Sequence, residues 1–445
     1  MEAQKPFRVV IVGAGLVGLT AAHIFSKAGI DFIILEKHDT PLSVQGATLA
    51  LWPHTLRIFD QLGLLEPAQS IFDTFKEVVT LSTDDAYIRM RDEMPLLIEK
   101  NHGHGIKIMY RPDMVKFLYE SLPEAVKSRV LLKKRVTDIT VSEDGVKVIC
   151  ADGSTEEGSI VIGADGVRSR VRPHMQALKR GMSVEDLPES LTHPYVASYR
   201  LYFASLPILP GLATNTRYDG TGDGVSTQIV NGTDTSLFGL YEKIDPPTSK
   251  ITRYTETDKS EILDRRGHLY MAPGWKFRDV DEKKIGEAGL INLEEGLIDE
   301  WSHKRIVLVG DAVRKLEPHA GLGFNDGVTD LVVLVNGLRR LLRDNKSPST
   351  AALEDLFQTY HKDRLDNTKK MMEMSMQTPR LLGWLDWRSK IMAKYILPNF
   401  PLSKMHINGV LGPVISDTPV LEWLEERALP KSLIAWKHHP VIESK

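Results

Sequence analysis

Short apolar runs rich in valine and isoleucine alternate along this chain with segments in which apolar residues recur at helical spacing. The runs with the composition of buried strands are 9–12, 32–35, 159–163 and 306–309. The segments with helical spacing are 19–28, 54–62, 325–342 and 351–377. Strands that alternate with helices in this way predict an α/β fold built on a parallel sheet.

Between residues 187 and 285 the pattern changes to strands in glycine-rich connections, which predicts a β-rich insertion. Its expected strands are 195–203, 226–230 and 236–241, with a hairpin loop at 220–224. Elsewhere we expect strands of a second layer in 71–105, a small antiparallel sheet in 129–150, and helices at 258–267 and 284–300.

The first strand leads directly into a glycine motif, Gly13-Ala-Gly15-Leu-Val-Gly18. Gly13 allows a tight turn, Gly15 lets a pyrophosphate approach the backbone, and Gly18 lets helix and strand pack closely. Glu36 ends the second strand 18 residues after Gly18 (36 minus 18), where an acid accepts hydrogen bonds from the adenosine ribose. Because an acid at this position disfavours a 2′-phosphate, the sequence predicts a dinucleotide site for FAD or NAD rather than NADP.

A later strand ends in a second polar motif. Gly310-Asp311 follows the strand 306–309, and Gly321 and Gly323 then precede the predicted helix that begins at Asn325. An acid at the carboxyl edge of a parallel sheet is placed to hold a sugar or ribityl hydroxyl. The helix amino terminus behind the glycines offers free N–H groups to an anionic ring.

Other positions have both a ligand-binding and a plain structural explanation. Asp165, in Gly163-Ala-Asp-Gly166, follows a strand, but taken alone a strand-turn-helix corner explains it more simply. Arg111, just before a predicted helix, either reaches a phosphate or ribityl oxygen or is solvated. Gly46 and Ala50 either let a flat ring lie against the backbone or form an ordinary turn.

Composition limits the classes of function. The chain has 445 residues, 42% hydrophobic and 26% charged, with a net charge of -3 and no basic stripe, which argues against nucleic acid as a partner. One cysteine, Cys150, allows no internal disulfide and suits a reducing compartment. His102-Gly-His104 lacks recognisable ligand spacing, so we expect no metal site. Without a spanning apolar stretch or a signal-peptide pattern, we expect a cytosolic protein, soluble or peripherally attached to a membrane.

The three strand-terminal motifs, in this order, resemble those of the FAD-dependent class A monooxygenases, the para-hydroxybenzoate and salicylate hydroxylase-like superfamily, over residues 7–375. The nearest resemblance is to fungal epoxidases and hydroxylases of secondary metabolism. The family's fold is a Rossmann-like FAD-binding domain with an inserted β-rich substrate domain, here followed by a C-terminal helical segment. The expected divisions are 1–75, 106–186 and 286–377 for the FAD-binding domain, 76–105 and 187–285 for the substrate layer and domain, and 378–445 for the tail.

The resemblance implies roles for individual residues. Glu36 would bind the adenosine ribose, Arg111 would lie near the ribityl-pyrophosphate, and Asp311 would bind a ribityl hydroxyl. Backbone N–H groups of Gly323, Phe324 and Asn325 would lie near the flavin pyrimidine ring. Asp165 and Gly166 would support both FAD and the pyridine nucleotide. The chain departs from the family at Arg314, where many members have His, and at Leu322, where Gln is frequent.

The resemblance also implies the chemistry. NAD(P)H, either NADH or NADPH, reduces FAD, and the reduced flavin reacts with O₂ to form a C4a-hydroperoxide. Its distal oxygen is transferred to an electron-rich alkene or arene, here of a prenylated, terpenoid or indole-type hydrophobic substrate. Arg200 and Tyr218, from the β-rich insertion, are the predicted substrate-side residues.

Two alternatives remain open from the sequence. One is an aromatic-ring hydroxylase of the phenol or salicylate type. The other is a non-catalytic carrier of prenylated proteins with the FAD fold, against which the intact Asp311 and Gly321-Leu-Gly323 argue. The tail, rich in Trp, Tyr and Pro, is expected either to pack over the FAD-binding domain or to touch a membrane surface.

Overall fold

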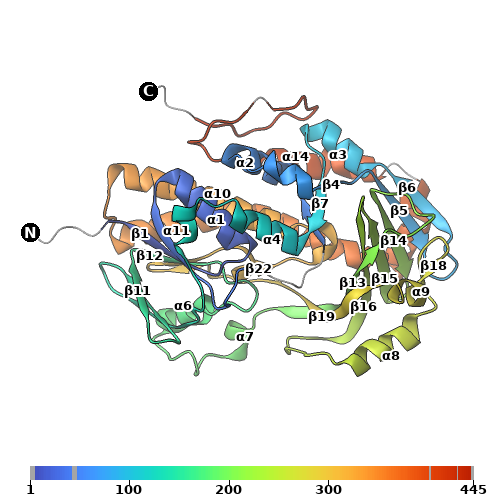
Figure 1. Ribbon diagram of the computed structural model, residues 1–445, viewed down its shortest axis with the longest axis horizontal. Coiled ribbons are helices and arrows are strands. Elements are labelled where there is room, and N and C mark those ends of the chain that lie inside the picture. The colour runs from blue at the N-terminus through green and yellow to red at the C-terminus, as the bar shows by residue number, and fades with distance from the viewer. Residues whose placement is uncertain (1–5, 43–47, 400–401, 428, 442–445) are drawn as a thin grey trace, which may run out of the picture.

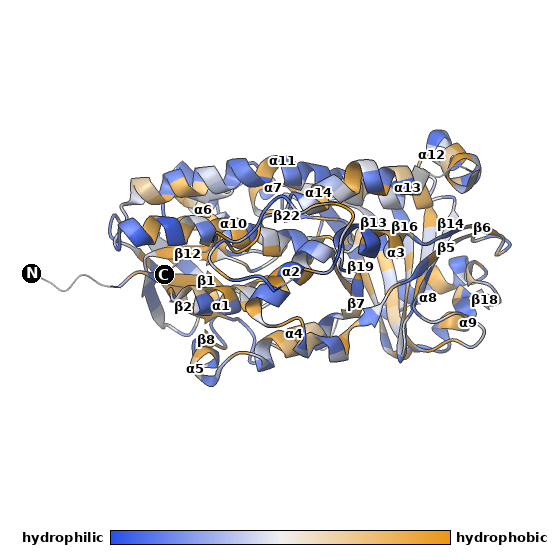
Figure 2. Ribbon diagram, turned by 90° about the horizontal axis from the view of Figure 1, so that it is seen from above, coloured by the Kyte–Doolittle hydropathy of each residue, from blue (hydrophilic) through white to orange (hydrophobic). Residues whose placement is uncertain are grey.

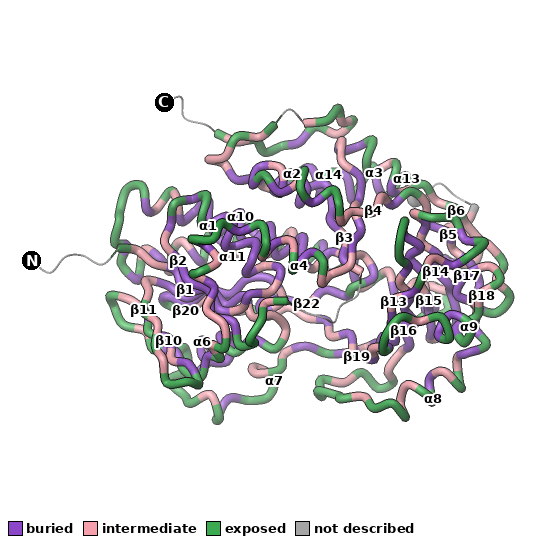
Figure 3. The backbone as a smooth tube through the Cα atoms, in the orientation of Figure 1, coloured by how far each residue is buried: buried purple, intermediate pink, exposed green. Residues whose placement is uncertain are grey.

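The computed structural model describes residues 6–42, 48–399, 402–427 and 429–441, and Gly46 lies outside these ranges. The two largest sheets lie at opposite ends of an elongated molecule, with helices running between them (Figure 1). Buried backbone gathers in these sheets and in the helices that join them, whereas the margins are exposed (Figure 3).

A six-stranded sheet forms one end of the molecule, in the order β20-β21-β12-β1-β2-β8. Its strands are β1 (Arg8–Val12), β2 (Asp31–Leu35), β8 (Val130–Leu131), β12 (Ile160–Gly163), β20 (Ser302–His303) and β21 (Ile306–Leu308). All pairs are parallel except β20 with β21. The predicted α/β fold is therefore confirmed, and the carboxyl ends of β1, β12 and β21 meet at one edge.

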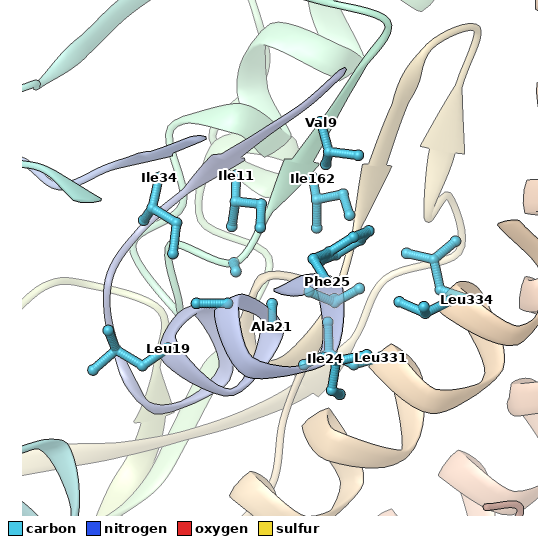
Figure 4. Close-up of a cluster of buried hydrophobic side chains, with 14 of the residues drawn as sticks. Val9, Ile11, Leu19, Ala21, Ile24, Phe25, Ile34, Ile162, Leu331 and Leu334 are labelled. Carbon is cyan, nitrogen blue, oxygen red and sulfur yellow. The ribbon is translucent and has the colours of Figure 1, made fainter. Parts of the chain in front are cut away.

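Two helices bury this sheet. The helix α1 (Leu16–Ala28) packs its apolar side, including Ala21, Ile24 and Phe25, between the strands and the helix α10 (Gly323–Asp344), as Figure 4 shows. Both helices begin at the edge where the strands end, which directs their amino termini toward the same space.

A small antiparallel sheet lies beside the first one, as predicted from residues 129–150. It consists of β9 (Val136–Val141), β10 (Val146–Cys150) and β11 (Thr155–Gly158). Cys150 is buried in β10 and is a free thiol.

An eight-stranded sheet forms the other end, in the order β22-β19-β13-β16-β15-β14-β5-β6. Its long strands are β13 (Val196–Pro207), β14 (Thr216–Gly222), β15 (Val225–Asn231), β16 (Thr235–Thr248) and β19 (Ile285–Leu297). The edge strands are β5 (Glu77–Ser82), β6 (Ile88–Asp92) and β22 (Arg314–Lys315). The predicted hairpin at 220–224 is confirmed, because β14 ends at Gly222 and β15 begins at Val225.

One helix prediction and one strand prediction are wrong. Residues 284–300 were expected to be helical, but β19 pairs with β13 along most of its length. Gly289 of β19 faces the ring of Phe203 so closely that an added Cβ would lie 2.4 Å from it. Residues 94–102, expected as strand, form the helix α3 (Met94–His102), with Pro95 in its first turn and Gly103 at its end in the left-handed region.

The helix α11 (Thr350–Leu382) runs alongside both sheets and links the two ends of the molecule (Figure 2). Short helices follow: α12 (Trp387–Ile391), α13 (Leu402–His406) and α14 (Gly412–Ser416). Beyond them the described residues 417–441 contain no helix or strand and pack over α2 (Pro53–Leu62), where Gln61 bonds the backbone of Leu421 and Arg57 pairs with Glu426 at 2.6 Å. Nowhere in the described ranges is a helix both long and apolar enough to cross a membrane.

Candidate active site

A first cavity, of about 600 Å³, opens at the edge where β1, β12 and β21 end. The predicted residues that line it are Gly13, Gly15, Glu36, Arg111, Asp165, Asp311, Gly321, Gly323 and Phe324. They come from six separate stretches of the chain, and the parallel sheet brings them together. The volume lies within the range of about 300–1,000 Å³ that is usual for ligand sites.

The glycine turn forms one wall of the first cavity. Gly13 has a φ of +103° and an added Cβ there would lie 2.8 Å from the carbonyl oxygen of Ala164, while one at Gly18 would lie 1.9 Å from the carbonyl oxygen of Gly13. Both positions therefore require glycine. Gly15, by contrast, faces open space, and the first turn of α1 has no side-chain cap. The turn thus presents free N–H groups to the cavity.

Glu36 stands at the end of β2 beside this turn. One carboxylate oxygen accepts a hydrogen bond from the backbone N–H of Ala14 at 2.8 Å, and the other accepts one from His38 at 3.0 Å. These bonds hold the side chain rigidly at the cavity wall, where it is 8% exposed.

Arg111 and Asp311 face the first cavity from two further elements. Arg111 opens the helix α4 (Arg111–Glu120), and no side-chain hydrogen bond or ion pair of its guanidinium occurs among the described residues. Burial lowers the pKa of Arg111, and the carboxylate of Asp311 offsets part of that effect. Asp311 pairs with Lys315 at 2.6 Å. Lys315 also lines the cavity, and sequence reasoning missed it, although its place four residues after Asp311 was the available signal.

Asp165 holds the corner between β12 and the helix α6 (Val171–Arg180). Its Oδ2 accepts hydrogen bonds from the backbone N–H groups of Arg170 at 2.6 Å and Val171 at 3.2 Å. Its Oδ1 is buried and has no hydrogen-bond partner in the described part of the chain. Burial raises the pKa of Asp165. The residue lines the cavity and supports the corner between strand and helix.

A clamp around Asn325 shapes the amino terminus of α10. Its side-chain amide donates to the carbonyl oxygens of Ala50 and Gly321, both at 2.8 Å, and its Oδ1 accepts from the backbone N–H of Trp52 at 2.9 Å. Gly321 has a φ of +63°, and an added Cβ would lie 2.6 Å from that of Ala50. The clamp fixes the strand β3 (Thr48–Leu51) against the helix start. Phe324 meets Phe59 edge to face at 6.4 Å.

A second cavity, of about 1080 Å³, lies between the eight-stranded sheet, α11 and the short helices of the tail. Its apolar wall includes Val78, Leu201, Phe203, Val230, Met374, Leu381, Met392, Ile407 and Leu411. Thr48, Pro318 and Gly321 line both cavities, so the two spaces meet at the turn before α10.

The two predicted substrate-side residues do not line either cavity. Side chains alternate along β13, and because Leu201 and Phe203 face the second cavity, Arg200 points to the opposite face. There it pairs with Glu242 at 2.6 Å. Although burial acts to raise the pKa of Glu242, hydrogen bonds from Arg200 and two neighbouring arginines hold it at about 2.

Tyr218 lies on that same far face. It is 4% exposed, belongs to a hydrophobic cluster, and accepts a hydrogen bond from the backbone N–H of Ala213 at 2.9 Å. These positions give no support to the predicted roles of Arg200 and Tyr218 on the substrate. The face that each residue occupies depends on strand register, which the sequence pattern did not specify.

The lining of the first cavity fits a flavin dinucleotide. It combines uncapped helix N–H groups for a pyrophosphate, fixed carboxylates for sugar hydroxyls, and the guanidinium of Arg111, which has no hydrogen-bond or ion-pair partner among the described residues. The described residues contain no group of three or more His, Cys, Asp or Glu side chains placed to hold a metal ion.

Comparison with known proteins agrees with this geometry. Residues 7–186 and 272–375 match a family model described as FAD binding domain. The chain is 34% identical over 408 residues to the FAD-dependent monooxygenase srdH of Neurospora crassa, covering 88% of this chain and 90% of srdH.

Solved structures share the fold. HpxO of Klebsiella pneumoniae, complexed with FAD and uric acid, aligns with a TM-score of 0.75 at 18% identity, over 93% of this chain and 97% of HpxO. A substrate complex of salicylate hydroxylase aligns with a TM-score of 0.70 at 19% identity, over 93% of this chain and 98% of that one. Together, the matched family, the shared fold and the cavity at the glycine turn confirm the predicted family and cofactor: this chain belongs to the FAD-dependent class A monooxygenases.

Proposed function

We propose that this enzyme uses NAD(P)H and O₂ to epoxidise or hydroxylate an electron-rich carbon of a hydrophobic secondary metabolite of the prenylated, terpenoid or indole type. The observation that carries the proposal is the large apolar cavity that meets the first cavity at Thr48, Pro318 and Gly321. A hydrophobic molecule held there would present one end to a group bound behind Gly321.

In the proposed binding mode the first cavity holds FAD along its length. The glycine turn and α1 would take the pyrophosphate, Glu36 the adenosine ribose, and Asp311 a ribityl hydroxyl, with Arg111 nearby. When bound and reduced by NAD(P)H, FAD would supply the electrons that activate O₂, so that one atom of O₂ is transferred to the substrate and the other leaves as water.

The chain's own contribution would be positioning and electrostatics. The uncapped first turn of α10, at Gly323 and Phe324, directs N–H groups and the positive end of the helix dipole into the first cavity. There it would stabilise negative charge on the pyrimidine end of the cofactor. The apolar walls of the second cavity would exclude water from the place where oxygen is transferred.

The test is oxygen-dependent consumption of NAD(P)H across candidate substrates, with mass spectrometry of the products. We expect a matching substrate to accelerate consumption and to gain one oxygen atom, and a phenol and a prenylated compound assayed in parallel separate ring hydroxylation from epoxidation. A flavin-loaded protein that no hydrophobic substrate stimulates, and that forms no product carrying one added oxygen, would refute the proposal.

We further propose that the tail contacts the surface of an anionic membrane. Between residues 384 and 416 there are four Lys or Arg and one Asp, a net charge of +3 within a chain of net charge -3. Exposed apolar side chains lie among them, namely Leu385, Trp387, Ile391, Met392, Tyr395, Met405 and Val410. The helix α12 projects beyond the eight-stranded sheet (Figure 2). Aromatic and basic side chains on one surface suit a lipid interface.

This surface also surrounds the second cavity, because Arg388, Met392 and Met405 line it. A hydrophobic substrate dissolved in the bilayer would therefore enter directly. Co-sedimentation with phosphatidylserine vesicles should exceed that with phosphatidylcholine vesicles and fall with salt. The double variant Trp387→Ser with Lys390→Glu should no longer sediment preferentially with the phosphatidylserine vesicles. Equal sedimentation with both vesicle types, or self-association of the protein through this surface in solution, would contradict the proposal.

A further inference from the structure

A strip of connected polar side chains crosses the sheet wall of the second cavity. Arg217 and Asp219 project into the cavity from β14, Gln228 from β15 and Tyr241 from β16. The strands are neighbours in the sheet, and the strip crosses them diagonally, because Asp219 is opposite Gln228 whereas Tyr241 is level with Thr221. Nothing in the proposed chemistry at the first cavity requires these groups.

The strip is a connected network. Nε of Arg217 donates to Oδ2 of Asp219 at 2.9 Å, and Nη2 lies 2.8 Å from the same oxygen in an ion pair. Gln228 donates to the other oxygen of Asp219 at 3.1 Å, and Tyr241 donates to Gln228 at 3.4 Å. The guanidinium of Arg217 lies 5.4 Å from the ring centre of Phe75, which supports it from one side.

The network leaves one donor group available. Asp219 is only 2% exposed and both of its oxygens are occupied. No hydrogen bond from Nη1 of Arg217 occurs among the described residues, and the side chain is 19% exposed at the cavity wall. Because Asp219 neutralises Arg217, this pair offers N–H donors without a net positive charge of its own, although Arg89 also lines the cavity.

We propose that Arg217, held by Asp219, is the subsite for a neutral oxygen acceptor, such as a ketone or ester carbonyl, on an otherwise apolar substrate. The inference rests on the proposed oxygenase function and adds a substrate class to it. A carboxylate is disfavoured, because it would lie beside the buried charge of Asp219 without a net positive charge to balance both.

The position of the strip also sets a length for the substrate. Tyr241 lies at its other end, stacked on His319 with ring centres 3.6 Å apart, and His319 is next to Pro318, where the cavities meet. Arg217 lies two strand spacings from Tyr241 across the sheet and four residues from it along the strands, so their backbone positions are roughly 16 Å apart. The substrate's carbonyl and the carbon that is oxygenated are therefore separated by about 10 Å or more, which suits a fused-ring or prenyl-extended molecule.

The test uses three probes that share one apolar body: 2-acetylnaphthalene, 2-naphthoate and 2-ethylnaphthalene. Binding to the FAD-loaded enzyme and to the flavin-free protein is followed by quenching of naphthalene fluorescence, without NAD(P)H. We expect the ketone to bind about 10-fold more tightly than the carboxylate or the hydrocarbon, as one hydrogen bond to a charged donor provides.

Two variants are expected to change the binding of the probes in different ways. Arg217→Met should reduce ketone binding to the level of the hydrocarbon. Asp219→Asn keeps the shape but removes the neutralising charge, so 2-naphthoate should bind about 10-fold more tightly than to the unmodified enzyme. The double variant should lose that gain. Tyr254→Phe, which removes a hydrogen bond to Asn292 outside the cavity, is the matched control and should keep the original selectivity.

Unchanged ketone binding by Arg217→Met, or no gain of carboxylate binding by Asp219→Asn, would overturn the subsite. These results are independent of oxygenation. An enzyme that oxygenates substrates but shows no selectivity among the probes refutes the subsite alone, whereas selective binding without any oxygenation refutes the proposed function alone.

Discussion

Asp330 offers a direct test of how the site is held in place. It is fully buried in α10, where its Oδ2 accepts hydrogen bonds from the backbone N–H of Gly310 at 2.9 Å and from Arg314 at 2.6 Å. Its Oδ1 accepts one from Arg364 of α11 at 2.9 Å. One carboxylate thus ties the turn that carries Asp311 to two helices.

The charges around Asp330 balance. Asp326 pairs with both Arg314 and Arg364, so two acids face two bases, and each of the four side chains is at most 4% exposed. Replacing Asp330 by Asn keeps an oxygen for the N–H of Gly310 but leaves one buried positive charge unbalanced. Removing one partner of a buried ion pair costs about 3–5 kcal/mol. That is a large share of the roughly 5–15 kcal/mol by which proteins are stable.

The assay is urea unfolding of the FAD-loaded enzyme, followed by tryptophan fluorescence, because Trp301 lies 5.8 Å from the guanidinium of Arg314. We expect Asp330→Asn to lose about 3–5 kcal/mol of unfolding free energy. Adding Arg314→Met restores neutrality and should recover part of the loss. The control is Arg265→Ala, which removes an ion pair with Glu242. Because Arg265 is 45% exposed, this change should cost less than about 1 kcal/mol of unfolding free energy. A loss below about 1 kcal/mol for Asp330→Asn would refute this reasoning.

Three further predictions concern the first cavity and a buried histidine. Asp311→Ala should weaken FAD binding by roughly 10- to 100-fold, through loss of a charge-assisted hydrogen bond, as measured by flavin titration of the apoprotein; an unchanged dissociation constant would contradict its assigned role. Gly321→Ala should lower both flavin content and turnover, because φ there is +63° and the new Cβ would collide with Ala50, whereas Gly15→Ala, with open space around it, should fold normally and impair flavin binding alone. Burial lowers the pKa of His54 from its ordinary 6.5 to about 3, so the folded state binds fewer protons than the unfolded state between these values. Its contribution to unfolding free energy should fall by about 1.4 kcal/mol per pH unit as pH drops below 6.5, and His54→Leu should flatten urea-unfolding stability measured across that range.

Much of the flavin site could be predicted from the sequence because it is made of local motifs. The spacing of Gly13, Gly15 and Gly18 requires a strand, a tight turn and a helix in immediate succession, and the structure places all three in that way. Glu36 and Asp311 each follow a strand directly. In a parallel sheet the carboxyl ends meet at one edge, so both residues line the same cavity.

The second domain was harder to predict for a physical reason. The charged and glycine-containing segment 284–300 was expected to be helical, yet it is held as β19 by pairing with β13, more than 80 residues earlier in the chain. Its conformation depends on a distant partner rather than on its own composition. Arg200 lies on the predicted strand, but the face that its side chain occupies could not be predicted, because a shift of one residue in register reverses every side chain.

The sequence by itself thus determined the family, the cofactor and the α/β architecture, since these depend on backbone motifs a few residues long whose steric demands are local. Only the tertiary structure decided which polar residues of the β-rich sheet face the second cavity, and so distinguished Arg217 with Asp219 from Arg200 with Glu242. Each pair joins an arginine and an acidic residue from strands of the β-rich sheet, so the residue types alone do not distinguish them. They differ in position because sheet register puts Arg217 and Asp219 on the face against which α11 and the tail pack, and the second cavity lies between that face and these helices.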